Sequence, residues 1–310
     1  MVCMIRVMPV LQPLKTILSA SRRTDIPAFY MDWFMGGIEK GSFEVINPYN
    51  QYRRHVPAHP HEVHSIVFWS KDFGPFLRGN FDRKLQQQGY RLFFNFTINA
   101  PAPALEPHVP ALSERIRQIT ELAQRHTPEA IIWRFDPICF FRHNNGTELH
   151  HNVGSLEPIA DALAAIGIRR CVTSFVDLYR KVQRRLPATG LKLVEPPAEV
   201  KRDTLLAMAA TLRQKKISLG ACCEQAVLDT FPPDAGITPG DCIPGPLLAR
   251  LFGDNFALKK DPGQRRSRGC TCNIAADIGS YRQQPCYHNC LFCYANPQDP
   301  ARRPLNGKRS

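Results

Sequence analysis

The sequence contains no apolar run that approaches the ~20 residues needed to cross a bilayer, so we expect no membrane-spanning helix. Residues 1–15 are mildly apolar but lack the small-residue cleavage site of a signal peptide, and we interpret them as a leader or an over-long start. The chain nevertheless carries eleven cysteines. Many cysteines without an export signal are typical of a reducing compartment, where thiols serve as ligands or core residues. We therefore predict a cytoplasmic protein with no membrane partner.

Two nucleotide-binding motifs are also absent. The sequence has neither a G-x-G-x-x-G pattern nor a P-loop lysine motif, which argues against a dinucleotide site and against a phosphate cradle for nucleoside triphosphates. It has no internal repeat beyond an alternation of strand-like and helix-like segments.

Length and composition are those of an ordinary globular protein. The 310 residues suit one large α/β domain or two ordinary ones, and 44% hydrophobic residues can form a sizeable core. The net charge is +13, of which residues 259–310 contribute +7, from ten Lys or Arg against three Asp. Such a basic region can bind nucleic acid, or it can offset the negative charge of a nearby thiolate-bound cluster.

Short apolar strands alternate with segments of helical spacing over most of the chain. This alternation is typical of a parallel sheet that is closed, or nearly closed, into a barrel. We therefore predict an α/β fold, a TIM-like (β/α) barrel that is complete or incomplete, over residues 16–228. The expected strands are 16–21, 43–46, 65–69, 91–98, 130–135, 170–175 and 217–219, and the expected helices are 28–40, 112–126, 158–166 and 204–214.

The composition changes after residue 228. Residues 229–296 are rich in Pro-Gly turns and in cysteine, so we predict an irregular cysteine-rich segment with a short helix near 247–252. Residues 297–310 are polar and rich in Pro and Arg, and we predict a disordered basic tail there.

Three cysteines near the end of the chain, Cys286, Cys290 and Cys293, have the spacing C-x3-C-x2-C, with Phe292 directly before the last. Three thiolates on one loop can hold three irons of a [4Fe–4S] cluster and leave the fourth iron open to a small molecule. This loop resembles the cluster loop of the radical S-adenosylmethionine (SAM) superfamily. The resemblance implies that the open iron binds SAM and that the sulfonium is split to give a 5′-deoxyadenosyl radical. Phe292 and Tyr294 would then pack near the adenine.

Zinc is the alternative metal for the same loop, with a fourth ligand from Cys270, Cys272 or His288. Structural zinc sites usually consist of two C-x2–4-C or C-x-x-H halves separated by a dozen or more residues, and this pairing is missing. We therefore favour an iron–sulfur cluster over zinc.

A second group of cysteines lies outside this loop. Cys222, Cys242, Cys270 and Cys272 all fall in the C-terminal third of the chain, and four thiolates would fully ligate a second iron–sulfur cluster. They would otherwise bind zinc or be buried, reduced thiols. Because Cys223 is adjacent to Cys222, the sequence does not indicate which of the two points inward.

Polar side chains follow several of the predicted strands, and α/β proteins place their sites at the carboxyl ends of parallel strands. Arg134 and Asp136 are two residues apart and so share a face of their strand. They would form an internal ion pair or a clamp for SAM or substrate, and both interpretations stay open. The candidates for the barrel mouth are Arg22, Arg23, Asp25, Lys71, Asn95, Arg134, Asp136 and Glu224.

Several segments resemble the domain of unknown function 1848 (DUF1848) family. The resemblance covers nearly the whole chain and rests on residues 19–27, 66–71, 134–137, 222–224, 277–279 and 286–295. It implies a radical-SAM-like barrel with a C-terminal cluster loop in a bacterial-type cytoplasmic protein. It does not supply a substrate.

Two function hypotheses follow. In the first, the protein is an enzyme that uses a [4Fe–4S] cluster and SAM to start radical chemistry on an unknown substrate, with electrons from an external reductant of the flavodoxin or ferredoxin type. In the second, it is a nucleic-acid-binding or repair-associated protein with a structural iron–sulfur or zinc site, and its basic tail contacts phosphates.

Overall fold

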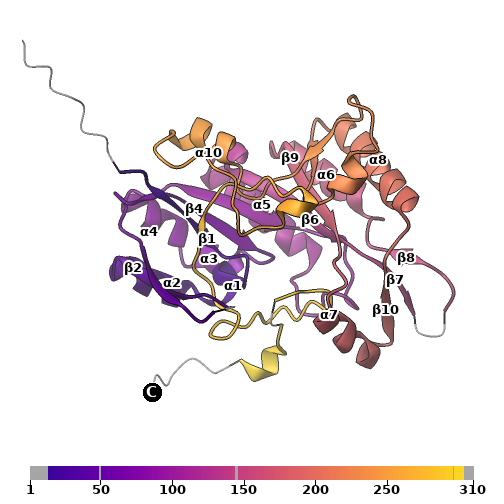
Figure 1. The fold of residues 1–310 in the computed structure, drawn as a ribbon, viewed down its shortest axis with the longest axis horizontal. Helices are drawn as coiled ribbons and strands as arrows, with labels where there is room; N and C mark the ends of the chain where they lie inside the picture. The colour runs from indigo at the N-terminus through magenta and orange to yellow at the C-terminus, as the bar shows by residue number, and fades with distance from the viewer. Residues whose placement is uncertain (1–12, 49, 144–145, 296, 304–310) are drawn as a thin grey trace, which may run out of the picture.

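A computed structural model describes residues 13–48, 50–143, 146–295 and 297–303. Its centre is an eight-stranded sheet in which every neighbouring pair of strands is parallel (Figure 1). The strand order is β12-β11-β9-β6-β5-β4-β1-β13. These strands are β1 (Thr16–Ala20), β4 (Val63–Ser70), β5 (Leu92–Thr97), β6 (Ile131–Ile138), β9 (Arg170–Phe175), β11 (Ser218–Ala221), β12 (Ile237–Pro239) and β13 (Ala276–Asp277).

The strand order confirms the predicted α/β fold, but the strands do not close into a barrel. From β1 to β12 the strands join the sheet in chain order, as in a (β/α) barrel, whereas β13 joins on the free side of β1. Within the described residues, β12 and β13 are the two edges of the sheet and do not pair with each other. β12 is only three residues long and ends at Pro239, which has no N–H to extend a ladder. A closed barrel, one of the two forms predicted from the sequence, is therefore not formed by these strands.

The helices are of very different lengths. They are α1 (Ile26–Phe29), α2 (Met31–Glu39), α3 (Gly74–Arg78), α4 (Phe81–Gln87), α5 (Leu112–Arg125), α6 (Leu156–Ala165), α7 (Arg180–Arg185), α8 (Ala198–Gln214), α9 (Gln225–Leu228) and α10 (Gly245–Phe252). Short 3-10 helices cover Pro128–Ala130, Leu186–Thr189, Arg266–Arg268 and Pro300–Arg302. Two small antiparallel sheets complete the fold, one of β2 (Ser42–Ile46) and β3 (Arg53–Pro57), the other of β7 (Phe140–His143), β8 (His150–His151) and β10 (Leu191–Val194).

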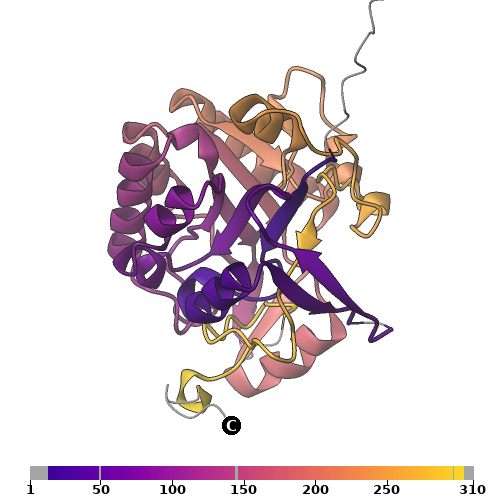
Figure 2. The same cartoon turned by 90° about the vertical axis from the view of Figure 1, so that its left-hand side faces the viewer.

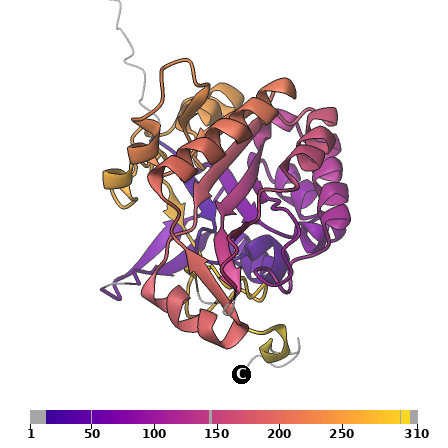
Figure 3. The ribbon, with the colours of Figure 1, turned by 90° about the vertical axis from the view of Figure 1, so that its right-hand side faces the viewer.

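The two faces of the main sheet pack against different parts of the chain. Successive side chains of a strand point to opposite faces. In β4, Phe68 packs into the large apolar core with the helices, whereas Val67 packs into a smaller core with Leu247 and Leu248 of α10. We call the helix-covered side the outer face and the other side the inner face. Figures 2 and 3 show the helices on one side of the sheet and the C-terminal segment crossing the other.

The C-terminal segment ends its path across the inner face at β13. Ala276 lies opposite Leu18 and Asp277 opposite Ser19, so the last strand lies beside the first (Figure 1). The chain that follows Asp277 therefore starts at the carboxyl end of β1.

Three sequence predictions of local structure are wrong in detail. The helix expected over 28–40 is divided at Tyr30, between α1 and α2. The strand expected at 43–46 belongs to the small β2–β3 sheet, because it alternates between exposed and buried side chains and is not buried on both faces. No strand is predicted between 175 and 217, yet Leu191–Val194 form β10, which buries Leu191 and Leu193.

The sequence predicts a leader at the start of the chain and a disordered basic tail at its end. Residues 1–12 of the expected leader and residues 304–310 of the expected tail lie outside the described residues. The start of the tail is placed: Pro300–Arg302 form a 3-10 turn, and the Arg303 guanidinium lies 5.3 Å from the ring centre of Phe29. Over the described residues, we find no helix with both the length and the apolar character that crossing a bilayer requires.

Two glycines let the end of β11 touch the loop that follows β12. A Cβ atom added at Gly240 would lie 2.9–3.1 Å from backbone atoms of Gly220 and Ala221, closer than real Cβ atoms normally approach. The Gly240 N–H also donates to the Ala221 carbonyl at 2.8 Å. Only residues without a side chain allow this backbone contact, which carries Cys222 and Cys242 towards each other.

We predict that Gly240→Ala lowers the free energy of unfolding by about 1–3 kcal/mol, because the new methyl group meets backbone that cannot rotate away. Gly154→Ala is the matched control, since a Cβ there meets nothing within 4 Å. Urea unfolding followed by circular dichroism measures both variants. Equal stabilities for the two would contradict the contact.

Candidate functional site

The loop that carries Cys286, Cys290 and Cys293, residues 286–293, is called the cluster loop here. It lies at the carboxyl ends of β1 and β4. His288 donates from Nε2 to Asp25 Oδ2 at 2.8 Å, and the Leu291 N–H donates to the Leu105 carbonyl at 2.9 Å. These bonds attach the loop to segments that precede it by about two hundred residues or more.

The Asp25 carboxylate is the main anchor of the cluster loop. Besides His288, it accepts from the Ala28 N–H at 3.0 Å, from Ser70 Oγ at 2.7 Å and from the Lys71 N–H at 2.8 Å. Asp25 is 6% exposed, and a buried carboxylate is stable only when its oxygens are hydrogen-bonded. Asp25 therefore joins the ends of β1 and β4, the start of α1 and the cluster loop.

Two of the three cysteines of the cluster loop, Cys290 and Cys293, sit on a tight turn. The Cys293 N–H donates to the Cys290 carbonyl at 3.1 Å, and Asn289 has a left-handed backbone with φ of 53°. Burial raises the pKa of Cys290, and the Lys71 ammonium opposes this rise, whereas Glu106 and then the neighbouring thiols of Cys293 and Cys286 raise the pKa further. The thiols are thus close enough to interact electrostatically with one another. The Ala295 N–H also donates to Cys293 Sγ at 3.4 Å.

Cationic side chains surround the cluster loop. Lys71 Nζ donates to Glu106 at 2.5 Å and lies 5.5 Å from the ring centre of Phe292. Burial alone would lower the pKa of Lys71, but Glu106 and the Cys290 thiol raise it above its ordinary value, so Lys71 stays charged. Arg185 donates to the carbonyls of Leu291 and Cys293.

The cluster loop has features that fit a bound anionic group. Within the described residues, Arg185 Nε and both Nε and Nη1 of Arg115 are buried without a hydrogen-bond partner. Both guanidinium groups lie near the Cys290 thiol. Buried donors without acceptors are costly, and a thiolate-bound cluster is the kind of negative centre that would satisfy them. No three His, Cys, Asp or Glu side chains in the described ranges are arranged to hold a single metal ion.

The second group of cysteines converges in the structure. The thiols of Cys222, Cys242, Cys272, Cys270 and Cys223 form a closed ring in which each lies near enough to two others to shift its pKa. We call these residues the five-thiol ring. All five are buried and none forms a disulfide, and the Sγ atoms of Cys222 and Cys223 are 3.6 Å apart. The structure thus brings together the four predicted cysteines and adds Cys223.

The electrostatics of the five-thiol ring favour a thiolate at Cys272. Hydrogen bonds from the Cys242 and Cys270 thiols, followed by the charge of Arg22, hold the pKa of Cys272 well below its usual range. The Cys242 N–H also donates to Cys272 Sγ at 3.3 Å. The pKa of Cys242 itself is raised by hydrogen bonds to Cys222 and Cys272 and by burial.

A polar layer on the inner face separates the five-thiol ring from the cluster loop. Arg134 donates from Nη1 to Cys242 Sγ at 3.0 Å and pairs with Asp136, so the ion pair anticipated from the sequence is present. The guanidinium groups of Arg22 and Arg134 lie 5.6 and 4.9 Å from the ring centre of Trp69. Asn95 lies beside them and donates to the Cys242 carbonyl at 2.9 Å.

The remaining predicted residues lie around this layer. Tyr294 donates to the Arg22 carbonyl at 2.6 Å, and Phe292 packs with Cys290 in a third apolar core. Glu224 directly follows Cys223 of the five-thiol ring in the sequence and accepts from the Phe175 N–H at 2.9 Å. Burial raises the pKa of the Glu224 carboxyl to about 7.

Sequence reasoning missed two acidic residues at the site. Asp277 accepts from Ser19 Oγ at 3.1 Å, from Ser21 Oγ at 2.7 Å and from the Arg22 N–H at 2.8 Å. Its strand is two residues long, too short for a period-2 pattern to reveal it. Glu106, the partner of Lys71, lies in an irregular segment without a sequence pattern. Its burial, which only the structure shows, is the feature that identifies it as a site residue.

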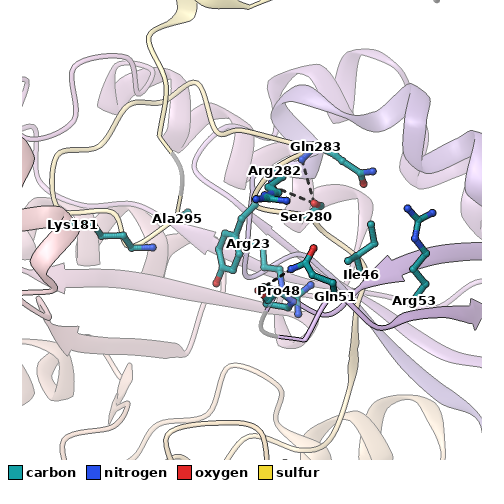
Figure 4. A pocket seen from close by; sticks show the side chains of 11 residues that line it. Arg23, Ile46, Pro48, Gln51, Arg53, Lys181, Ser280, Arg282, Gln283 and Ala295 are labelled. Atoms are coloured by element: carbon teal, nitrogen blue, oxygen red, sulfur yellow. Dashed lines mark hydrogen bonds between the residues drawn. The ribbon is translucent and has the colours of Figure 1, made fainter.

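A pocket of about 580 Å³ opens beside the cluster loop (Figure 4). Its described lining contains four cations and no Asp or Glu. The lining residues are Arg23, Ile46, Pro48, Gln51, Arg53, Lys181, Ser280, Tyr281, Arg282, Gln283 and Ala295. Lys181 is close enough to Cys293 for the thiol to raise its pKa, although burial lowers that pKa more strongly. The pocket therefore has a positive lining and reaches the edge of the cluster loop.

Comparison with known protein families assigns the chain to a family. The family model described as domain of unknown function (DUF1848) matches residues 17–295, which is most of the chain. The chain belongs to the DUF1848 family. The match confirms the family predicted from the sequence, and it covers both cysteine groups of this DUF1848 protein. A search of curated proteins gave no match.

The contacts of Asp25 give a prediction for this DUF1848 protein. Asp25→Asn should lower the free energy of unfolding by about 2–4 kcal/mol, because an amide cannot accept all four bonds and removes the charge that strengthens them. Asp234→Asn, at an exposed position, is the matched control. Urea unfolding measures both. A loss no larger than that of the control would show that Asp25 is not the anchor.

Proposed function

We propose that this DUF1848 protein is a radical-SAM-type enzyme in which Cys286, Cys290 and Cys293 ligate a [4Fe–4S] cluster. The observation that supports the proposal most directly is three thiols on one short loop, surrounded by buried cations, at the carboxyl edge of a parallel sheet. A bound cluster of this kind, with one iron free of protein ligands, would supply the electron that cleaves SAM into methionine and a 5′-deoxyadenosyl radical.

The residues around the loop would protect such chemistry from water. Phe292 and Cys290 are 7% and 4% exposed and pack with Val182 of α7 and Leu193 of β10. Lys71 and Arg185 would offset the negative charge that three thiolates bring into this apolar surrounding. Excluding water and other reductants is the main task of a protein that handles a reactive radical.

The polar ligands have two places to bind. The pocket of Figure 4 adjoins the loop through Ala295 and Lys181 and would admit SAM or substrate from solvent. On the inner face, Arg22 Nη2 and Arg134 Nε are buried without partners among the described residues. An external reductant of the flavodoxin or ferredoxin type would supply the electron.

Anaerobic reconstitution with iron and sulfide, followed by dithionite and SAM, tests the proposal. We expect 5′-deoxyadenosine to form, and we expect Cys290→Ala to lower its rate by about 10³-fold or more, since the cluster loses one of its three protein ligands. Cys171→Ala is the matched control, because Cys171 is a buried cysteine on the outer face.

A colourless protein with stoichiometric zinc would contradict the proposal. So would iron-loaded protein that forms no 5′-deoxyadenosine, or a Cys290→Ala variant that is as active as the control.

The positive pocket supports a second candidate function, binding of nucleic acid. Lys181 and Arg282 form no ion pair within the described residues, whereas Arg53 pairs with Glu44 at 3.0 Å. Lys181 also lies 5.5 Å from the ring centre of Tyr281. Cations beside an aromatic ring are the groups that single-stranded nucleic acids use for phosphate contact and base stacking.

Salt dependence of oligonucleotide binding tests this second function. We predict that Lys181→Gln combined with Arg282→Gln weakens binding and lowers the slope of log K against log salt by about 1–2. A double variant of Arg83→Gln and Lys192→Gln, which removes two exposed charges elsewhere, should leave the slope near the wild-type value. Equal slopes in the two double variants would exclude the pocket as the binding site.

A further inference from the structure

The five-thiol ring is assembled from three separate segments of the chain. Cys222 and Cys223 follow β11, Cys242 follows β12, and Cys270 and Cys272 precede β13. Side chains from three segments gather here in one buried cluster, in which each thiol lies near enough to two others to shift its pKa. A single buried cysteine is an ordinary small core residue, but five thiols gathered in one place need a more specific explanation.

The backbone is arranged to direct these thiols at one another. Neighbouring residues of a strand point to opposite sides, so Cys222 and Cys223 would normally diverge. Cys223 instead has a left-handed backbone with φ of 62°, and both thiols reach the ring. A non-glycine residue in this region is strained and persists where the surroundings enforce it, most often at functional sites. The contact of Gly220 with Gly240 brings in Cys242 from the other side.

Donors and positive charges converge on the sulfur atoms. Arg134 Nη1 and the Cys242 N–H donate to Cys242 Sγ and Cys272 Sγ at 3.0 and 3.3 Å. Arg22 lies near Cys272, and Arg265 lies near Cys222 and Cys223. Each of these arginines also has a carboxylate partner, namely Asp136 for Arg134, Asp261 for Arg22 and Asp177 for Arg265.

The guanidinium groups are nevertheless not saturated. Arg134 Nε and Arg22 Nη2 remain buried without an acceptor in the described part of the chain, although the carboxylates pair with other atoms of the same side chains. N–H donors aimed at sulfur and unsatisfied buried guanidinium atoms are the surroundings that stabilise an anionic thiolate-bound cluster and tune its reduction potential.

We propose that the five-thiol ring holds a second iron–sulfur cluster, ligated on every iron by protein cysteines. Cys222, Cys242, Cys270 and Cys272 complete the four ligands, and Cys223 is a spare thiol beside Cys222 and Cys270. This assignment is separate from the proposed SAM chemistry, because the five-thiol ring shares no cysteine with the cluster loop.

Complete ligation determines what such a cluster does. With no open iron it makes and breaks no bond to a substrate, and its chemistry is the gain and loss of one electron. Trp69 packs against the apolar core that holds the five-thiol ring and contacts Arg22, whose carbonyl accepts from Tyr294, the residue after Cys293. The second cluster would take one electron from the external flavodoxin- or ferredoxin-type donor, which is oxidised, and pass that electron through this layer to the cluster loop.

Metal content per chain tests the assignment on the full chain after anaerobic reconstitution. We expect about eight irons and eight sulfides in the wild type. The triple variant Cys286→Ala, Cys290→Ala, Cys293→Ala should keep about four of each, because the five-thiol ring is intact. Cys242→Ala with Cys272→Ala should lose about four and keep the cluster loop's share. The matched control, Cys139→Ala with Cys171→Ala, should keep all.

Three results would overturn the assignment: no iron in the triple variant, zinc in place of iron there, or full iron in the Cys242/Cys272 double variant. Circular dichroism of each variant separates loss of metal from loss of fold. If the double variant does not fold, the triple variant alone decides, through its iron content and the electron paramagnetic resonance signal of its reduced form. Iron retained by the triple variant but no 5′-deoxyadenosine from the wild type would refute the proposed function and leave the second cluster standing.

Discussion

Two buried carboxylates hold the C-terminal segment on the sheet, and the remainder of the site depends on them. Asp277 binds the end of β1 through Ser19, Ser21 and the Arg22 N–H, and Asp25 binds His288 of the cluster loop. A buried charge is costly unless its oxygens are fully hydrogen-bonded, so each carboxylate tolerates only the one arrangement that supplies all its donors. The position of the cysteines relative to the strands is fixed by that requirement.

The open edge of the sheet gives the cysteines their location. In a closed barrel the interior is filled by side chains of the strands themselves. Here the sheet ends at β12 and β13, and the C-terminal segment fills the inner face with α10 and the five-thiol ring. The irregular, cysteine-rich part of the sequence thus serves as the inner layer of the domain, and its polar contacts with Asn95 and Arg134 are contacts with the sheet itself.

The sequence predicts the buried strands well, but it does not predict which side chains of the site contact one another. The strand at 170–175 has the bounds expected, because a strand buried on both faces is a short apolar run between polar ends. The two-residue β13 and the irregular segment around Glu106 carry no periodicity, so Asp277 and Glu106 could not be recognised as partners. The four cysteines of the second group could be named from the sequence. Their contact with one another, and the entry of Cys223, depend on the Gly220–Gly240 contact and a left-handed backbone that only tertiary structure reveals.

The pairing of β13 with β1 has a consequence for how the chain is made. Leu18 has Ala276 as its neighbour, so β1 remains an unpaired edge on one side until residues more than 250 positions later have been synthesised. Contacts of such large sequence separation form slowly, since the intervening chain must be ordered first. The cluster loop, which follows β13, and the five-thiol ring, which includes Cys270 and Cys272 just before β13, therefore depend on a pairing that forms late in folding.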